Sequence, residues 1–340
     1  MAQVKPLISV IGSLNVDFVT LTPRVPAAGE TLTARSMTVH AGGKGANQAV
    51  ACGKASWVTK DAQDVDVAMI GCVGKGDPYY ASLLKPTLEN SGVSMAGIEE
   101  IDGSQTGTAT ILVEDSGQNR ILFVPGANFD GMQDSRKAID LATKTAEPTV
   151  LVMQGEIPRR PTFEILEYFG SRSTQTIWNP APVYDDGIPA RVLQHIDYLI
   201  VNETECLLLA KGASMAITVE DEDNMTSTEL ESIAKAYKKI GVKNLLVTLG
   251  ARGVFYSAAD GQQGLVAGLR VPKVVDTTAA GDTFVGFFAA ALARYGSRNA
   301  TSAGAVFDVA VAVKRANAGA AVTVQRPGAG ESIPFGYEVS

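Results

Sequence analysis

The sequence predicts an α/β fold with a mostly parallel central sheet, because short apolar runs alternate with amphipathic stretches along most of its 340 residues. Parallel strands joined by crossover helices produce this alternation. Two pairs of β-rich segments interrupt it and predict a further, antiparallel element. Six apolar runs are predicted to form the core strands, at residues 7–11, 67–70, 150–153, 176–178, 198–201 and 245–248.

The antiparallel element is predicted from segments early in the chain. Residues 18–21 would pair with 31–39, and residues 107–113 with 120–124. Residues 114–119 join the second pair, and their Asp, Ser, Gly and Asn content is typical of a turn.

The clearest helix is predicted at residues 228–240. Its apolar residues repeat at helical spacing and would cover one face of the sheet. Thr228 and Glu231 have the spacing of a capping box at its start. The acidic run at residues 220–223, just before this helix, is predicted to be a solvated surface loop.

Composition excludes several classes of protein. A hydrophobic content of 46% supplies a core for one large α/β domain or two smaller ones. The net charge of −7 gives no overall positive field that would attract nucleic acid or an anionic membrane. No segment approaches the roughly 18 to 20 apolar residues that span a bilayer, and the first residues lack an apolar signal region. We therefore expect a soluble protein of the cytoplasm, with the nucleus as a further location.

Cysteine and histidine usage limits the chemistry. Cys52, Cys72 and Cys206 are widely spaced in apolar surroundings, so we expect core residues rather than a metal–thiolate site. His40 and His195 are the only histidines, and no G-x-S-x-G motif accompanies them. A general base would more naturally be a carboxylate.

Residues 276–283 combine two carboxylates with a tight turn of small residues that opens into an apolar helical run. Exposed N–H groups at a helix start favour negative charge, and Ala279, Ala280 and Gly281 leave room for a phosphate. Asp282 stands where a carboxylate could take a proton from an attacking hydroxyl. The alternative is that Asp282 only caps the helix.

A second small-residue cluster, at residues 41–50, also runs into a helical pattern. It is not a Walker A loop, because the G-x-x-x-x-G-K-[ST] spacing is absent, and the G-x-G-x-x-G spacing is absent too. Two such turns in one chain favour an anion-handling site over two unrelated helix caps.

Residues suited to ligand contact follow several predicted strands, at the sheet edge where parallel sheets bind ligands. They are Asn15, Glu156, Asn179, Asn202 and Gly250. Alternation along an extended chain places Asn15 and Asp17 on one face, where an amide and a carboxylate can hold adjacent sugar hydroxyls. The alternative for this pair is two turn residues.

The two turns together resemble the signatures of the ribokinase family of carbohydrate kinases, also called the PfkB family. Gly42-Gly43 stands for its Gly-Gly pair and residues 276–282 for its D-T-x-A-A-G-D turn, in the family's order. The resemblance covers residues 12–334 and is strongest to eukaryotic-like members. It implies a three-layer α/β/α sandwich as a single domain over residues 1–340. A small β-sheet lid over the sugar, from residues 15–40 and 101–126, and a homodimer paired through that lid are also implied.

The resemblance assigns roles to individual residues. Asp282 would be the base, with Ala279, Ala280 and Gly281 as the anion hole. The sugar would be held by Asn15, Asp17, Gly43, Lys44, Asn47, Glu156 and Asp282. The nucleotide would be held by Asn202, Glu205, Thr248, Gly250, Gly253, Gly281 and Asn317.

Two cations are also implied. Glu205 would hold Mg²⁺, largely through water. A potassium ion beside the anion hole would order the turn. Without the resemblance, Asn202 would be an ordinary helix cap and Asp276 a strand-end carboxylate bound to its own backbone. The potassium site would be formed by Asp276, the carbonyls of Thr278, Thr323, Arg326 and Gly328, and the hydroxyl of Ser332.

The implied activity is transfer of the ATP γ-phosphate to O5 of D-ribose. A kinase of another sugar or nucleoside, such as deoxyribose, fructose or pseudouridine, is the alternative. A sugar- and nucleotide-binding regulator without turnover is a second one, which the intact Asp282 argues against. The chain departs from the family at Gly155, where a larger residue is expected, at residues 56–66, and in the tail after Pro334. Asn317 replaces a histidine that bacterial relatives can carry.

Overall fold

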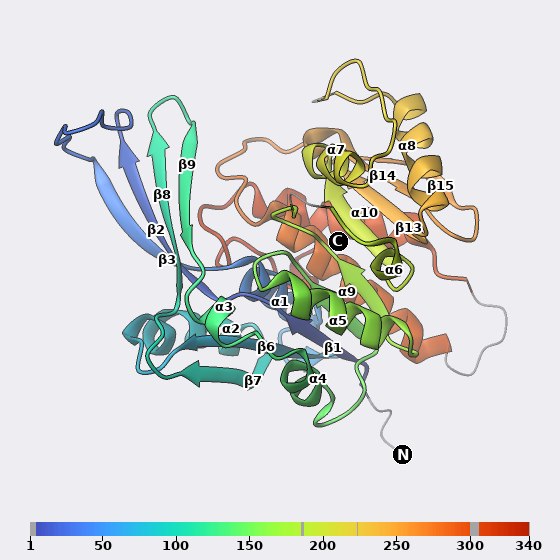
Figure 1. The fold of residues 1–340 in the computed structure, drawn as a ribbon, viewed down its shortest axis with the longest axis horizontal. Coiled ribbons are helices and arrows are strands. Elements are labelled where there is room, and N and C mark those ends of the chain that lie inside the picture. Colours follow the sequence, from blue (N-terminus) through green and yellow to red (C-terminus); the bar gives the residue numbers. More distant parts are fainter. Residues whose placement is uncertain (1–4, 185–186, 223, 300–305, 340) are drawn as a thin grey trace.

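The computed structural model describes residues 5–184, 187–222, 224–299 and 306–339. Within them, a nine-stranded sheet forms the centre, in the order β15-β14-β13-β12-β11-β10-β1-β6-β7 (Figure 1). The seven neighbouring strands from β13 to β7 in this order are all parallel. Strands β14 and β15 add an antiparallel edge. The strands are β1 (Leu7–Ile11), β6 (Asp66–Gly74), β7 (Val93–Ile101), β10 (Val150–Met153), β11 (Gln175–Trp178), β12 (Tyr198–Asn202), β13 (Asn244–Thr248), β14 (Gly253–Ser257) and β15 (Gln263–Ala267).

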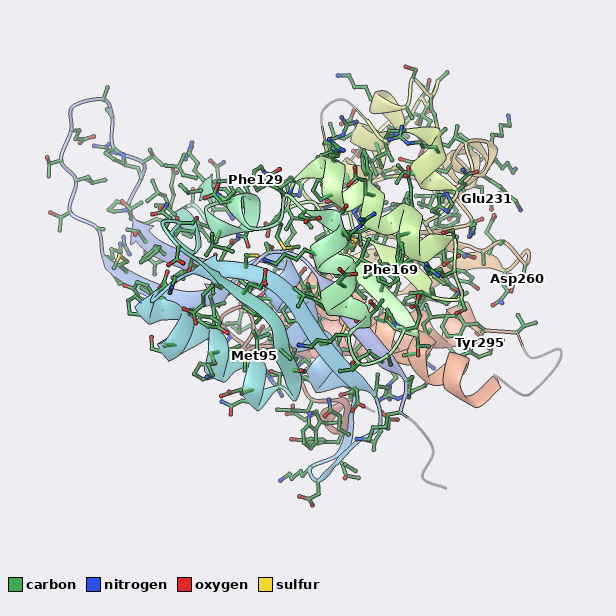
Figure 2. All side chains as sticks on the ribbon, turned by 60° about the horizontal axis from the view of Figure 1, so that its bottom comes forward. Met95, Phe129, Phe169, Glu231, Asp260 and Tyr295 are labelled. Carbon is green, nitrogen blue, oxygen red and sulfur yellow. The ribbon has the colours of Figure 1, made fainter. Side chains whose placement is uncertain are left out.

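Helices cover both faces of this sheet, as successive strand residues show. Val150 and Val152 of β10 join the core beneath α1, α9 and α10, whereas Leu151 and Met153 join the core beneath α4, α5, α7 and α8. Phe169 of α5 is buried in the second core, and Asp260 in the β14–β15 turn is exposed (Figure 2). The helices are α1 (Lys44–Ala55), α2 (Lys85–Asn90), α3 (Ala127–Asp130), α4 (Ser135–Thr143), α5 (Arg159–Gly170), α6 (Ala190–Leu193), α7 (Glu203–Gly212), α8 (Ser227–Lys239), α9 (Ala280–Asn299) and α10 (Val309–Thr323).

The fold confirms the three-layer α/β/α sandwich with a mostly parallel sheet. All six predicted core strands are present, and β1 and β10 have the predicted bounds. Strands β7, β14 and β15 were not predicted. The three cysteines are free and buried, as expected of core residues. No helix in the described part of the chain is long and apolar enough to cross a membrane.

The start of α8 differs from the sequence prediction. Thr226, not Thr228, caps the helix, and its partner in the capping box is Glu229 rather than Glu231. Both threonines precede a glutamate at the same spacing. The run before α8 is exposed at residues 221 and 222, and residue 223 lies outside the described residues.

A second sheet, which we call the lid, stands away from the central sheet as an arm (Figure 1). Its order is β3-β2-β8-β9, formed by β2 (Asn15–Thr22), β3 (Ser36–Gly42), β8 (Gly107–Glu114) and β9 (Asn119–Val124). Both predicted antiparallel pairs are present, but β2 and β8 are parallel neighbours. The prediction of a strand from residue 31 was wrong, since residues 31–35 belong to no strand and β3 runs from Ser36 to Gly42.

Short elements occupy the two segments that depart from the family pattern, at residues 56–66 and in the tail after Pro334. The first segment contains the hairpin of β4 (Trp57–Thr59) and β5 (Ala62–Gln63). A π-helical turn at Tyr80–Leu84 leads into α2, and the tail ends in a 3₁₀ turn at Gly336–Glu338.

Helix α1 packs directly on α9, and this contact joins the two small-residue turns. At Gly286 of α9 a Cβ atom would lie 2.3 Å from the Cβ of Ala51. The helices therefore touch backbone to backbone, which fixes the first turns of both relative to each other.

We expect Gly286→Ala to lower the free energy of unfolding by about 1–3 kcal/mol, because overpacking separates the two helices. The strain must exceed the gain of about 1 kcal/mol that alanine brings to a helix. Gly281→Ala in the same helix is the control, since its Cβ would meet nothing within 4 Å. Urea unfolding measures both; equal stability of the two variants would contradict the close contact.

Candidate active site

A cavity of about 220 Å³ opens at the carboxyl ends of β11, β12 and β13, facing the start of α9. This is the edge where parallel sheets bind ligands. It is lined by residues from both small-residue turns and from three strand ends. They are Lys44, Asn179, Ile200, Val201, Asn202, Glu205, Thr248, Thr277, Ala279, Gly281, Asp282 and Val285.

The turn before α9 is held in an unusual conformation. Ala279 has a φ of 60°, which is strained for a residue with a side chain. Its carbonyl accepts from both the N–H and the hydroxyl of Thr283, each at 2.8 Å. These bonds begin α9 at Ala280, so Gly281 and Asp282 present first-turn N–H groups at the cavity, where an anion is favoured.

Asp282 is buried in that first turn, and both of its carboxylate oxygens accept hydrogen bonds from α1. Asn47 Nδ2 lies 3.3 Å from Oδ2, and Gln48 Nε2 lies 3.0 Å from Oδ1. Amide N–H donors on both oxygens suit an ionised carboxylate. A cap would instead accept from its own helix, so the base interpretation fits these contacts better.

Glu156 follows β10 and is hydrogen-bonded to the segment after β1 and to the start of α1. Its Oε2 accepts from the Ser13 hydroxyl at 2.5 Å and from the Lys44 N–H at 2.9 Å. Burial raises the pKa of Glu156, although these two hydrogen bonds oppose the change. Gly155 before it has no room for a side chain, because a Cβ would lie 2.3 Å from the carbonyl oxygen of Pro182.

Asp17 lies in β2 at the base of the lid. Burial, helped by the negative charges of Glu156 and Asp282, raises its pKa to about 7. Gly42 on β3 makes room for it, since a Cβ there would lie 2.1 Å from Asp17 Oδ2. The three carboxylates thus form one electrostatic cluster.

Lys44 is the cation of this cluster. Burial alone would lower the pKa of Lys44, but the carboxylates of Asp282, Glu156 and Glu205 raise it above its ordinary value. Gly43 before it has a φ of 88°, and a Cβ there would lie 2.8 Å from the backbone nitrogen of Asn15. Only glycine fits this turn, which lets α1 begin directly against β2.

Asn15 is oriented by a residue that the sequence did not single out. Its Oδ1 accepts from Asn128 Nδ2 at 2.7 Å, and Asn128 Oδ1 accepts from the backbone N–H of Leu14 at 2.8 Å. Asn15 therefore keeps its own NH₂ group available for a ligand. Ser13, Gln48, Asn128 and Gln154 were not predicted as site residues. Gln48 lies in the small-residue cluster at residues 41–50 and Ser13 lies near Asn15, but Asn128 and Gln154 have no motif around them.

The start of α7 forms the opposite wall. Asn202 caps the helix by accepting from the Glu205 N–H at 2.7 Å, and Glu205 Oε2 accepts from the Asn202 N–H at 2.9 Å. The cap expected of an ordinary helix start is therefore present, and both residues also line the cavity. Burial raises the pKa of Glu205, against the hydrogen bond from Asn202 and the charge of Lys44.

A second, more apolar cavity of about 270 Å³ meets the first at Thr277. Gly250 and Asn317 line it, and Asn317 Nδ2 donates to the Val266 carbonyl at 3.4 Å. Gly253 lies outside this lining; its missing side chain instead allows β14 to approach Val266 of β15, where a Cβ would lie 2.0 Å from the carbonyl oxygen. The remaining lining is Ala251, Gly268, Leu269, Val271, Val274, Thr277, Ala280, Ala320, Ala321 and Val324.

Asp276 connects the anion turn to the C-terminal segment. Its Oδ1 accepts from the N–H and the hydroxyl of Thr278, and its Oδ2 accepts from the Gly328 N–H at 3.1 Å. Burial acts to raise the pKa of Asp276, but these hydrogen bonds lower it overall. The Ser332 hydroxyl donates to the Ala329 carbonyl, and Thr323 Oγ1 lies 2.9 Å from Thr283 Oγ1. The remaining residue of the predicted potassium set, Arg326, pairs through its guanidinium with Glu338.

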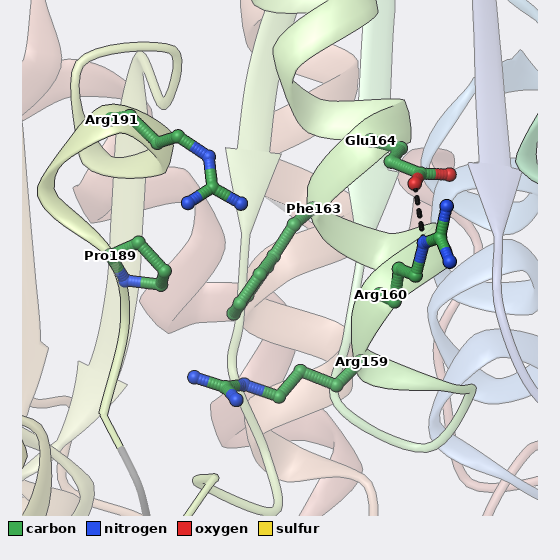
Figure 3. A pocket seen from close by; sticks show the side chains of 6 residues that line it. All are labelled: Arg159, Arg160, Phe163, Glu164, Pro189 and Arg191. Carbon is green, nitrogen blue, oxygen red and sulfur yellow. Dashed lines mark hydrogen bonds and ion pairs between the residues drawn. The ribbon is translucent and has the colours of Figure 1, made fainter.

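A larger cavity, about 480 Å³, lies at the start of α5 and is lined by three arginines around Phe163 (Figure 3). Arg160 pairs with Glu164, and Arg191 pairs with Glu167. Arg159 lies over the Phe163 ring and donates to the Gly187 carbonyl. Each guanidinium is thus already engaged, and none of the predicted site residues lines this cavity.

Comparison with known proteins places the chain in a family. The family described as pfkB family carbohydrate kinase matches residues 5–335, so the chain belongs to this family of kinases. It is 35% identical over 335 residues to the ribokinase of Schizosaccharomyces pombe, covering 98% of this chain and 96% of that protein. The deoxyribokinase of Salmonella typhi is 30% identical, with coverage of 96% and 95%. The structure of Arabidopsis thaliana ribokinase complexed with ribose and ATP matches with a TM-score of 0.79 at 27% identity, covering 98% and 96%.

We expect Asp17→Asn to stabilise the protein above about pH 7. The pKa of Asp17 in the folded protein lies above its ordinary value of 3.8, so ionised Asp17 weakens the fold above pH 7 and the penalty vanishes as pH falls towards 4. The expected gain at pH 8 is about 1–3 kcal/mol, given about 1.4 kcal/mol per pKa unit and partial exposure.

Thermal unfolding at pH 8 and at pH 4 measures this difference. Asp61→Asn, in the exposed β4–β5 turn, is the matched control and should change stability little at either pH. A gain for Asp17→Asn that is equal at both pH values would contradict the raised pKa.

Proposed function

We propose that this protein transfers the γ-phosphate of ATP to O5 of D-ribose, giving D-ribose 5-phosphate and ADP. The observation that carries the proposal is the position of Asp282. It is a buried carboxylate in the first turn of a helix, in one cavity with Gly281 and Lys44. The similarity to proteins named ribokinase over nearly the whole chain supports the choice of acceptor.

In the proposed reaction, Asp282 accepts the proton of the sugar hydroxymethyl group as that oxygen attacks the γ-phosphorus. A new oxygen–phosphorus bond forms while the bond to the β,γ-bridging oxygen breaks, and ADP leaves. Residues 279–281 form the anion hole that stabilises charge on the transferring group. Lys44 adds a positive charge that is fixed in place before the substrates arrive.

The sugar would lie between the base of the lid and the start of α1. Asn15 offers an NH₂ group, and Asp17 and Glu156 offer acceptors for neighbouring hydroxyls. Lys44 and Asn47 complete this set from α1, next to the Gly43 turn. Holding the acceptor oxygen beside Asp282 supplies the proximity that phosphoryl transfer requires.

The nucleotide would extend from the anion hole past Thr277, with its base in the apolar cavity beside Gly250 and Asn317. Asn202, Thr248 and Gly281 line the path of the phosphates. We propose Glu205 as the residue that holds Mg²⁺ through water; an oxygen ligand suits this cation, which neutralises phosphate charge when bound.

We also propose a potassium site at the junction of the anion turn and the C-terminal segment. The hydrogen bond from the Gly328 N–H to Asp276 supports it, because it joins two of the segments that would supply oxygen ligands. The ion would strengthen the positive field of the anion turn without touching the sugar.

Deoxyribose is the second candidate acceptor, favoured by the 30% identity to a deoxyribokinase. Fructose and pseudouridine are further acceptors that the same machinery would accommodate, because the base and the anion hole act on the attacking oxygen rather than on the ring. A regulator without turnover is disfavoured, since binding alone has no use for a buried base.

We expect ribose-dependent release of ADP from MgATP that rises with potassium and falls by about 10³-fold or more in Asp282→Asn, because the amide accepts no proton. The assay compares D-ribose, 2-deoxyribose, fructose and pseudouridine, with and without potassium. Preference for another acceptor would change the assigned substrate but leave the proposed mechanism unchanged. Binding of ribose and ATP without any turnover would instead support the regulator.

We further propose a homodimer formed through the lid. Strand register places Ile121 and Phe123 on the face of Asp17, and Met37 and Leu122 on the opposite face. All four are exposed, Leu122 at 69%. An arm with apolar side chains on both faces is typical of an interaction surface.

Light scattering at working concentration should therefore give twice the mass of the chain. The double variant Met37→Glu with Leu122→Glu should give the mass of one chain while remaining folded. A wild-type protein with the mass of one chain would refute the dimer.

We propose a cytoplasmic location, with the nucleus as an alternative. The three free cysteines support a reducing compartment. Fractionation of cells that express the protein is the test, and recovery in a secretory fraction would contradict the proposal.

A further inference from the structure

Gln48, a buried residue of α1 to which the sequence assigned no role, touches the proposed base. Its Nε2 donates to Asp282 Oδ1 and to Asn179 Oδ1, each at 3.0 Å. Its oxygen accepts from Gln154 Nε2 at 2.8 Å. Both N–H bonds and the oxygen of this amide are therefore engaged, and the side chain links the ends of β10 and β11 to the start of α9.

Charge sets the direction of this chain of hydrogen bonds. An ionised carboxylate only accepts, so Asp282 requires the NH₂ group of Gln48 to face it, and the Gln48 oxygen then faces Gln154. Asn179 is fixed from its other side, because its Nδ2 donates to the Ile200 carbonyl at 2.9 Å. Each amide thus has one orientation that agrees with an ionised Asp282.

Gln154 fixes the Gln48 amide by donating to its oxygen. It is buried, and Gly12 leaves room for it, since a Cβ at Gly12 would lie 2.0 Å from Gln154 Oε1. Among the described residues, that oxygen has no hydrogen-bond partner. A buried acceptor without a partner is costly, so the orientation of the Gln154 amide is imposed by the rest of the chain.

Gln48 itself has no exposed surface, so it meets no substrate and acts through Asp282. The other groups around the carboxylate are already assigned: Asn47 donates to its second oxygen, and Lys44, Asp17 and Glu156 supply the nearby charges.

We infer that Gln48, backed by Gln154, is a positioning residue that holds the Asp282 carboxylate aimed at the sugar hydroxyl. The inference rests on the proposed role of Asp282 as the base. A positioning role differs from a purely structural one, because it affects the chemical step and leaves substrate binding unchanged.

The experiment measures kcat and KM for ribose and ATP across pH in four variants, together with urea unfolding. We expect Gln48→Leu to lower kcat about 10- to 100-fold with little change in either KM, the loss typical of a hydrogen bond to a charged group. Gln154→Leu should act in the same direction with a smaller effect. The matched control is Gln63→Leu in β5, beyond the C-terminal end of α1; the amide of Gln63 donates to Ser56 and to the Gly92 carbonyl and does not line the cavity. Its kcat should remain that of the wild type even where stability falls.

Gln48→Glu separates charge from packing. It keeps the shape of the side chain but sets a second carboxylate against Asp282, and such a pair holds a proton between its members at neutral pH. We expect kcat of this variant to be low at neutral pH and to recover as the pH rises, which a packing defect would not produce.

The outcomes separate this inference from the proposed function. Loss of turnover in Asp282→Asn together with a selective fall of kcat in Gln48→Leu supports both. A second outcome is that Asp282→Asn loses turnover while Gln48→Leu keeps a kcat within twofold of the wild type or shows only a raised KM. That result overturns the role of Gln48 and leaves the proposed base in place. Full turnover in Asp282→Asn overturns the proposed base and the role of Gln48 with it.

Discussion

The site depends on one buried cation that is shared among several carboxylates. Ionised groups are costly to bury unless paired, and Lys44 compensates Asp282, Glu156 and Glu205 from a single position. Burial raises the pKa values of Asp17, Glu156 and Glu205, and the negative charge of Asp282 adds to this effect at all three. One positive charge does not balance the carboxyl groups of Asp17, Asp282, Glu156 and Glu205, so their ionisation leaves surplus negative charge in the site. Ligands that bring hydroxyl donors or a cation relieve that surplus.

Helix α1 places this cation and the groups around it. Lys44, Asn47 and Gln48 follow one another at positions i, i+3 and i+4, so they share the face that meets Asp282. At the other end of α1, Lys54 Nζ donates to the carbonyls of Gly330 and Ile333, each at 2.8 Å. Helix α1 thus contacts the proposed sugar site, the proposed base Asp282 and the C-terminal segment. A small displacement of α1 would therefore shift its contacts with all three.

Local patterns in the sequence predicted what is local in the structure. The two small-residue turns, the core strands and Asp282 at a helix start follow from residue spacing alone. The parallel pairing of β2 with β8 joins distant segments, and β15 is a short edge strand, so neither leaves a clear pattern. The start of α8 was misplaced because Thr226 and Thr228 both precede a glutamate at capping distance. Asn128 and Gln48 act through hydrogen bonds to residues far away in the sequence, which only the folded chain brings together.

The lid begins at the proposed sugar site. Residues 12–14 alone separate β1, an interior strand of the main sheet, from β2 of the lid. Asn15 at the root of β2 pairs with Gly42 of β3 and Gly107 of β8, so these three lid strands leave the body at one level. The arm is therefore joined to the body at the two proposed sugar contacts, Asn15 and Asp17. A change in the angle of the arm would move these two side chains, so a ligand that fixes them would also fix that angle.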